Sequence, residues 1–132
     1  MLDRAQLIDL VETRYFAAMD RKDLDATMSA LAPDCVLTVY PAGDRFAGRD
    51  AAIRPMFAKA FADYESLWHG NFNWVVDEPQ QRLAAWFDVR LVRTDGSVVE
   101  MSNGKFFTVS DGRLSRLDLY LSTSEQIVGD NG

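Results

Sequence analysis

The sequence predicts an α+β fold in which three helices are followed by a curved antiparallel sheet. Apolar residues recur every three to four positions in the first half of the chain and every second position from about residue 65 onward. Short turn sequences separate the later segments, as in consecutive hairpins. Helices followed by a run of strands are typical of α+β proteins. With 132 residues and no internal repeat or linker, we expect a single domain, residues 1–132.

The first half of the chain is expected to contain three helices. Roughly residues 4–20 form an amphipathic helix, and a short second helix beginning near Leu24 ends before Pro33. The third helix opens at Asp50, which we expect to be its N-cap, and Phe57 belongs to its apolar stripe.

The strands are expected from Cys35 onward. A first strand covers Cys35 to Tyr40, and the two sequences Thr94-Asp95-Gly96 and Asp111-Gly112 are hairpin signals. The four longer strands are Glu65 to Asp77, Arg82 to Arg93, Ser97 to Ser110, and Arg113 to Ser122. We expect the helices to cover one face of the resulting sheet.

Large apolar side chains occur on both faces of this predicted sheet. Phe87 shares one face with its apolar neighbours, whereas Trp86 lies on the other, and Trp68 and Trp74 occupy the preceding strand. Because a solvated face rarely carries several tryptophans, we expect the outer face to form a homodimer contact. The alternative is that these long side chains merely cover each other.

Composition and charge exclude several function classes. The formal net charge of −6 provides no basic face, so we expect no nucleic acid partner. No apolar run approaches the roughly 18 residues that span a bilayer, so we expect no membrane partner. The first residues lack the layout of a signal peptide, which predicts a cytoplasmic protein. The single cysteine, Cys35, predicts neither a disulfide nor a metal cluster.

Three polar side chains stand out in the strand that follows the third helix. Strict alternation places His69, Asn71 and Asn73 on one face. Either the trio lines a pocket for a polar ligand, or it faces solvent while the intervening aromatic residues face the core. Alternation alone does not choose between these interpretations. Taken singly, Tyr15 fits a core tyrosine and Asp20 a solvated turn acid.

Four segments of the chain resemble the nuclear-transport-factor-2-like superfamily, which includes ketosteroid isomerase, scytalone dehydratase and SnoaL-like polyketide cyclases. They are Arg14 to Ala26, Leu31 to Val36, Gly48 to Ile53, and Asp111 to Tyr120. The resemblance implies a cone in which the curved antiparallel sheet wraps round the long N-terminal helix and leaves an apolar pocket. It also implies a dimer through the outer sheet face.

The resemblance also implies roles for particular residues. Tyr15 falls where ketosteroid isomerase has the tyrosine that donates to the substrate oxygen. Tyr40 replaces the aspartate that serves there as general base, and Lys105 lies near the place of the second acid, so steroid isomerisation by that mechanism is not expected. Tyr15, Asp20 and His69 resemble the tyrosine, aspartate and histidine of the dehydratase and SnoaL-like branch. The second histidine of the scytalone dehydratase type is missing.

We therefore expect a small enzyme that, without cofactor or metal, removes a proton next to a carbonyl of an apolar oxygenated compound. The reaction would be an isomerisation, a dehydration or a cyclisation. His69 would act as base or acid, Tyr15 as donor to the carbonyl, and Asp20 as the partner of His69. The candidate substrate-binding residues are Tyr40, Phe57, Asn73, Phe87 and Lys105. The alternatives are a non-catalytic, dimeric ligand-binding module and the small subunit of an oxygenase.

Overall fold

A long helix opens the fold. The computed structural model describes residues 1–123, and this helix runs without a break from Arg4 to Asp20. It consists of α1 (Arg4–Asp9), the π-helical segment η1 (Leu10–Ala17) and α2 (Ala18–Asp20). The Asp3 carboxylate accepts a hydrogen bond from the backbone N–H of Gln6 at 2.8 Å, and the Gln6 side chain accepts one from the Asp3 N–H at 2.9 Å. This capping box fixes the first turn of the helix.

The remaining helices are short. They are α3 (Leu24–Ser29), η2 (Arg49–Ile53) and α4 (Arg54–Asp63). The prediction that Asp50 caps the third helix is wrong, because Gly48 precedes this helix with a φ of 99°. Asp50 lies within the first turn, where its carboxylate accepts a hydrogen bond from Arg49 at 3.0 Å. No helix among residues 1–123 is long and apolar enough to cross a membrane.

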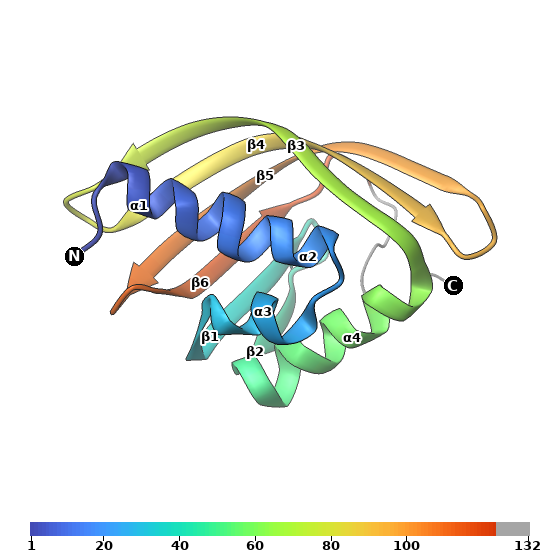
Figure 1. Cartoon of the computed structure of the whole chain (residues 1–132), viewed down its shortest axis with the longest axis horizontal. Coiled ribbons are helices and arrows are strands. Elements are labelled where there is room, and N and C mark those ends of the chain that lie inside the picture. The colour runs from blue at the N-terminus through green and yellow to red at the C-terminus, as the bar shows by residue number, and fades with distance from the viewer. Residues whose placement is uncertain (124–132) are drawn as a thin grey trace.

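Six strands form one open, curved sheet (Figure 1). They are β1 (Leu31–Tyr40), β2 (Asp44–Ala47), β3 (Tyr64–Asp77), β4 (Arg82–Arg93), β5 (Val98–Ser110) and β6 (Arg113–Tyr120). Their order in the sheet is β2-β1-β6-β5-β4-β3. Figure 1 shows the helices lying under the concave face, so the α+β prediction is confirmed.

Two features of the sheet differ from the sequence prediction. The short edge strand β2 was not expected, and it pairs with β1 across the turn that follows Tyr40. The sheet is mixed rather than purely antiparallel, because β6 lies parallel to β1. A meander of hairpins determines only how consecutive strands pair, and β1 is separated from β6 by two helical segments and four strands.

A β-bulge interrupts β3 between Gly70 and Asn73, directly after His69. Gly70 pairs with Asp88 and Asn73 with Trp86, so β3 uses one more residue than β4 between these two pairs. Asn71 occupies the extra position with a φ of 55°, a left-handed conformation that asparagine tolerates better than most residues. The bulge reverses the alternation of faces along the strand.

The reversal corrects the prediction that His69, Asn71 and Asn73 share one face. Before the bulge, Leu67 and His69 point to the concave side, and after it Phe72, Trp74 and Val76 pack against the core. Asn71 and Asn73 are exposed. The pocket interpretation therefore holds for His69, before the bulge, and the solvent interpretation holds for Asn71 and Asn73, from the bulge onward.

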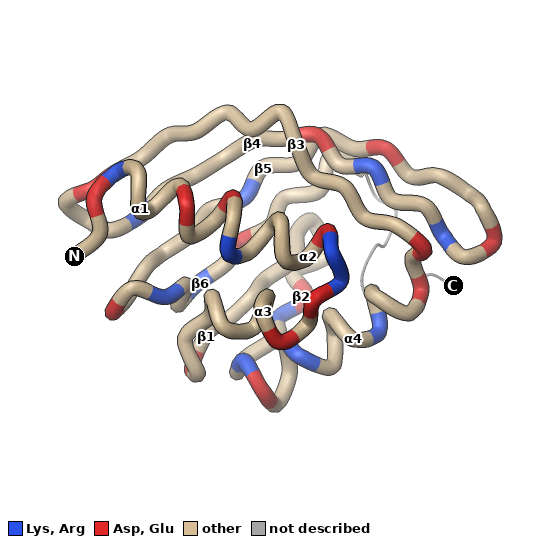
Figure 2. The backbone as a smooth tube through the Cα atoms, viewed as in Figure 1, with Lys and Arg blue, Asp and Glu red and all other residues tan. Residues whose placement is uncertain are grey.

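The two faces of the sheet differ in what they carry. The concave face and the long helix share one core, in which the Phe16 ring lies 4.9 Å from Phe87 and 5.2 Å from Phe72 between centroids. The convex face exposes a set of large apolar side chains that we call the outer patch: Trp68, Val75, Trp86, Val98, Phe106 and Tyr120. Acidic and basic residues are interspersed over the helices and turns (Figure 2).

Candidate active site

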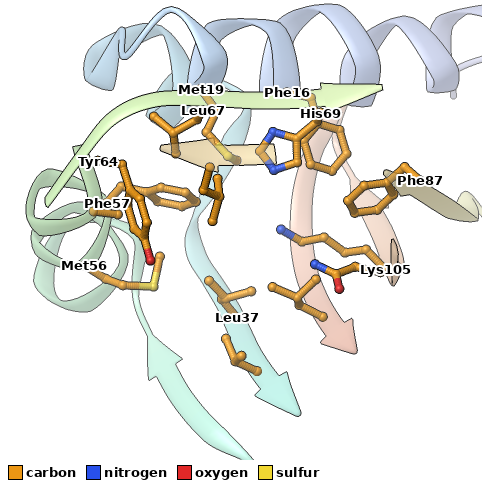
Figure 3. A pocket seen from close by; sticks show the side chains of 15 residues that line it. Phe16, Met19, Leu37, Met56, Phe57, Tyr64, Leu67, His69, Phe87 and Lys105 are labelled. Carbon is orange, nitrogen blue, oxygen red and sulfur yellow. The ribbon is translucent and has the colours of Figure 1, made fainter. Parts of the chain in front are cut away.

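A cavity of about 60 Å³ lies between the helices and the concave face of the sheet. Most of its lining is apolar, and its polar side chains are Tyr64, His69, Asn103 and Lys105 (Figure 3). These four come from β3 and β5, so the sheet supplies the polar groups. The apolar lining includes Phe16, Met19, Leu37, Met56, Phe57 and Phe87.

His69 is held by Asp20, the last residue of the long helix. The Asp20 carboxylate lies 2.6 Å from the ring Nδ1 and accepts a second hydrogen bond, at 2.9 Å, from the backbone N–H of His69. A carboxylate only accepts hydrogen bonds, so this contact places a ring proton on Nδ1 and leaves Nε2 as the ring nitrogen that is not engaged by Asp20. The His69 side chain is 10% exposed and that of Asp20 is 21% exposed.

The second polar pair lies deeper in the molecule. The Lys105 amine donates to the Tyr15 hydroxyl at 2.6 Å, and both residues are buried. Burial lowers the pKa of Lys105 to about 7, against a small opposing influence of Cys35. Burial also raises the pKa of Tyr15 well above its usual value of 10.0. Near neutral pH, a protonated hydroxyl therefore faces an amine that readily loses its proton.

Asn103 completes the polar lining and is not among the site residues expected from the sequence. Its side-chain oxygen accepts a hydrogen bond from the backbone N–H of Ser122 at 3.0 Å, and its amide nitrogen has only a long contact with the sulfur of Met101, at 3.9 Å. The signal was present in β5, where Asn103 and Lys105 are polar residues in an alternating series of buried apolar ones. Polar groups at such positions need partners.

The predicted site residues fall into three groups. His69, Phe57, Phe87 and Lys105 line the cavity. Asp20 and Tyr15 lie one contact behind it, through His69 and Lys105 respectively. Tyr15 therefore does not reach the cavity directly, although it was expected to contact a carbonyl.

Tyr40 and Asn73 do not line this cavity. The Tyr40 ring stacks on Tyr120 at 4.5 Å, a neighbour on the convex face, because Leu37 and Val39 take the inward positions of β1. Asn73 lies beyond the bulge, where its amide donates to the backbone carbonyl of Asn71 at 3.1 Å. Both positions correct the expectation that these residues line the pocket.

Comparison with known proteins identifies the fold family. A family model described as a SnoaL-like domain matches residues 13–117. A putative polyketide cyclase from Xanthomonas campestris pv. campestris has a similar structure, with a TM-score of 0.77 and 25% identity over 89% of this chain and 90% of that one. No curated protein matches the sequence significantly.

Two further solved structures share the fold at lower identity. A putative ketosteroid isomerase from Kribbella flavida has a TM-score of 0.69 and 20% identity over 92% of this chain and 82% of that one. An LEH-like epoxide hydrolase from M. tuberculosis has a TM-score of 0.74 and 18% identity over 89% and 84% of the two chains. These likenesses establish the architecture, and the chemistry must be argued from the cavity itself.

Proposed function

Because the chain belongs to the SnoaL-like family, we propose that it is a cofactor-free enzyme that removes a proton next to a carbonyl group in a small, apolar, oxygenated compound. The observation that carries this proposal is the Asp20–His69 pair, whose ring faces an apolar cavity that also holds Lys105 and Asn103. Isomerisation, dehydration and cyclisation all begin with this step, and the proposal is limited to it.

In this mechanism His69 is the base. The Asp20 carboxylate orients the ring, keeps its proton on Nδ1 and stabilises the positive charge that appears when Nε2 takes a proton. The second hydrogen bond, to the backbone N–H of His69, prevents the carboxylate from swinging away. Positioned general bases of this kind contribute about 10²–10⁴-fold in rate.

In this proposal the carbonyl oxygen is held by the polar side chains that β5 contributes to the cavity. The Lys105 amine and the Asn103 amide can both donate hydrogen bonds to it, in surroundings from which water is largely excluded. Tyr15 is a positioning residue in this arrangement, because its hydroxyl contacts Lys105 and not the cavity. This differs from the expected role of Tyr15 as the direct donor.

The size of the cavity limits the substrate. Its volume of about 60 Å³ has room for roughly four to six water-sized groups, whereas ligand sites usually have about 300–1,000 Å³. A small carbonyl compound fits without change, and a larger ring requires movement of the lining. Met19 and Met56 provide flexible side chains for such movement.

The experiment that tests the proposal measures proton removal directly. Cyclopentanone and cyclohexenone are incubated with the protein in D₂O, and the loss of the protons next to the carbonyl is followed by NMR. We expect exchange that is at least about 100-fold slower in His69→Gln and unchanged in Asn73→Ala, an exposed control on the same strand. Binding of the ketones without exchange would instead support a non-catalytic ligand-binding module.

We also propose that the outer patch forms a homodimer contact. Trp68, Trp86 and Phe106 are each about half exposed on the convex face, which is unusual for a sheet face in water. Trp74 does not contribute, because the bulge turns it to the concave side, where it stacks on Phe72 at 5.3 Å between centroids. Analytical ultracentrifugation should show a dimer for the wild type and a monomer for Trp86→Lys. A monomeric wild type at high concentration would refute the contact.

A further inference from the structure

The amine of Lys105 lies in an environment that is unusual for a lysine. The residue is 3% exposed, and among residues 1–123 no carboxylate lies within salt-bridge distance of its nitrogen. Asp20, the acid of the site, is already engaged by His69. The hydrogen-bond partner of the Lys105 amine is the neutral hydroxyl of Tyr15. A buried lysine usually has a charged partner, and the described part of the chain supplies none for Lys105.

The groups that face this amine favour its neutral form. Tyr15 of η1 and Cys35 of β1 are both buried, and burial raises the pKa of Cys35 to about 12, so neither supplies a negative charge near neutral pH. Three aromatic rings, those of Tyr15, Phe16 and Phe107, have centroids 4.7, 5.5 and 5.9 Å from the nitrogen, and their attraction for a cation opposes the effect of burial without supplying a charged partner. The other polar side chains of the cavity wall, His69, Asn103 and Tyr64, include no carboxylate.

A neutral lysine amine in an apolar cavity is a nucleophile for carbonyl compounds. Figure 3 shows the Lys105 side chain reaching into the same cavity that the His69 ring faces. Lys105 is therefore within the cavity that a carbonyl compound would enter. Lys105 is one of only three lysines in the chain, with Lys22 and Lys59, and neither of these lines the cavity.

We propose that Lys105 binds aldehydes and ketones covalently, as an imine formed between its Nζ and the carbonyl carbon. The inference rests on the proposed function and names the substrate class of the same cavity. Nζ attacks the carbonyl carbon and forms the C–N bond. Both amine protons end on the carbonyl oxygen, the C–O bond breaks, and one water molecule leaves. No oxidant or reductant is needed.

The imine would strengthen the proton removal assigned to His69. Once protonated, it withdraws electrons from the neighbouring carbon more strongly than the parent carbonyl, so the adjacent C–H bond becomes more acidic. An ester or amide would not form this adduct under the same conditions. The cavity would therefore select aldehydes and ketones by reaction as well as by shape.

The test is capture of the imine by sodium cyanoborohydride with butanal as the probe. The protein is treated at pH 7, and labelled lysines are located by peptide mass mapping, which also separates any label on the terminal amine. An ordinary lysine with a pKa of about 10.4 has about 1 in 2,500 of its amines neutral at pH 7. We therefore expect Lys105 to be labelled at least about 100-fold faster than Lys22 or Lys59.

Three variants identify the labelled lysine and test whether the native cavity is too tight for butanal. Lys105→Met should lose the fast label, and Lys59→Met should retain it. Phe57→Ala widens the cavity and allows butanal to reach the amine if the native lining is too tight. Fast labelling of Lys105 in either the wild type or Phe57→Ala supports the imine. Labelling of Lys105 no faster than that of Lys59 in both proteins overturns it.

The two proposals can fail separately. Reductive capture does not require proton removal, so His69→Gln should still be labelled at Lys105. Labelling in His69→Gln together with no solvent exchange by the wild type would leave the imine standing and remove the enzymatic proposal. Solvent exchange by the wild type without a Lys105 adduct would support the enzymatic proposal and overturn the imine.

Discussion

Replacement of Lys105 by methionine should change how the stability of the protein depends on pH. Between pH 7 and the ordinary lysine pKa of 10.5, the unfolded chain holds a proton on Lys105 that the folded protein has given up, because burial lowers the pKa of the folded form to about 7. The unfolded state therefore binds more protons, and the free energy of unfolding rises with pH in this range. Methionine has a similar length and no titratable group.

The size of the effect follows from the two pKa values. Each pKa unit corresponds to about 1.4 kcal/mol, and Lys105 is about half protonated in the folded state at pH 7. The wild type should therefore gain about 2 kcal/mol of stability between pH 7 and pH 9 from this group alone. Lys105→Met should lack this gain. Cys35 and Tyr15, whose pKa values are raised by burial, oppose this gain as the pH approaches and passes their ordinary values of 9.0 and 10.0, and both residues are present in both proteins.

The measurement is urea unfolding of the wild type and of Lys105→Met, followed by circular dichroism at intervals between pH 7 and pH 9. The difference between the two free energies of unfolding should change by about 2 kcal/mol over this range. Lys59→Met, a replacement of a lysine outside the cavity, should follow the wild type. Parallel curves for the wild type and Lys105→Met would show that the buried amine keeps an ordinary pKa, and the chemical basis of the imine would be lost.

Three further predictions test the surroundings of the site. Asp20→Asn should slow solvent exchange of ketone protons about 10–100-fold, because the amide neither carries the charge nor fixes the tautomer of His69, and an unchanged rate in the NMR assay would remove Asp20 from the mechanism. Phe87→Ala should lower the free energy of unfolding in urea by about 3–5 kcal/mol, and a loss below 1 kcal/mol would contradict its place in the core. Gly70→Ala should destabilise by about 1–3 kcal/mol and alter tryptophan fluorescence, because the new methyl group would lie 2.2 Å from the Trp68 indole; an unchanged emission spectrum would count against this packing.

Much of the fold could be predicted because the spacing of apolar residues and the sequences of the turns are local properties of the chain. The observed bounds of β4, Arg82–Arg93, are those expected from alternation, and the helix over residues 4–20 was also expected as a whole. The parallel pairing of β1 with β6 could not be predicted in this way, because it joins segments about 80 residues apart. Local patterns do not determine which distant edges meet.

The site was harder to predict than the fold because one extra residue in β3, Asn71, decides which side chains of that strand face the cavity. Alternation treats a strand as regular, and a bulge at Asn71 violates this assumption and sends Asn73 to the opposite face from His69. The sequence Gly70-Asn71 within a strand was a usable signal, since glycine often marks a bulge. The contact between Tyr15 and Lys105 joins residues 90 positions apart and required the three-dimensional structure.

The bulge also gives β3 two halves that are free to change independently. Substitutions between Leu67 and Gly70 affect the cavity, and substitutions beyond Asn71 affect the packing under the long helix. Deletion of Asn71 would restore strict alternation and force one half to turn over, bringing either His69 or the Phe72–Trp74 pair into water. The length of this strand is therefore more tightly constrained than its composition, and related chains should accept altered side chains here far more readily than a lost or added residue.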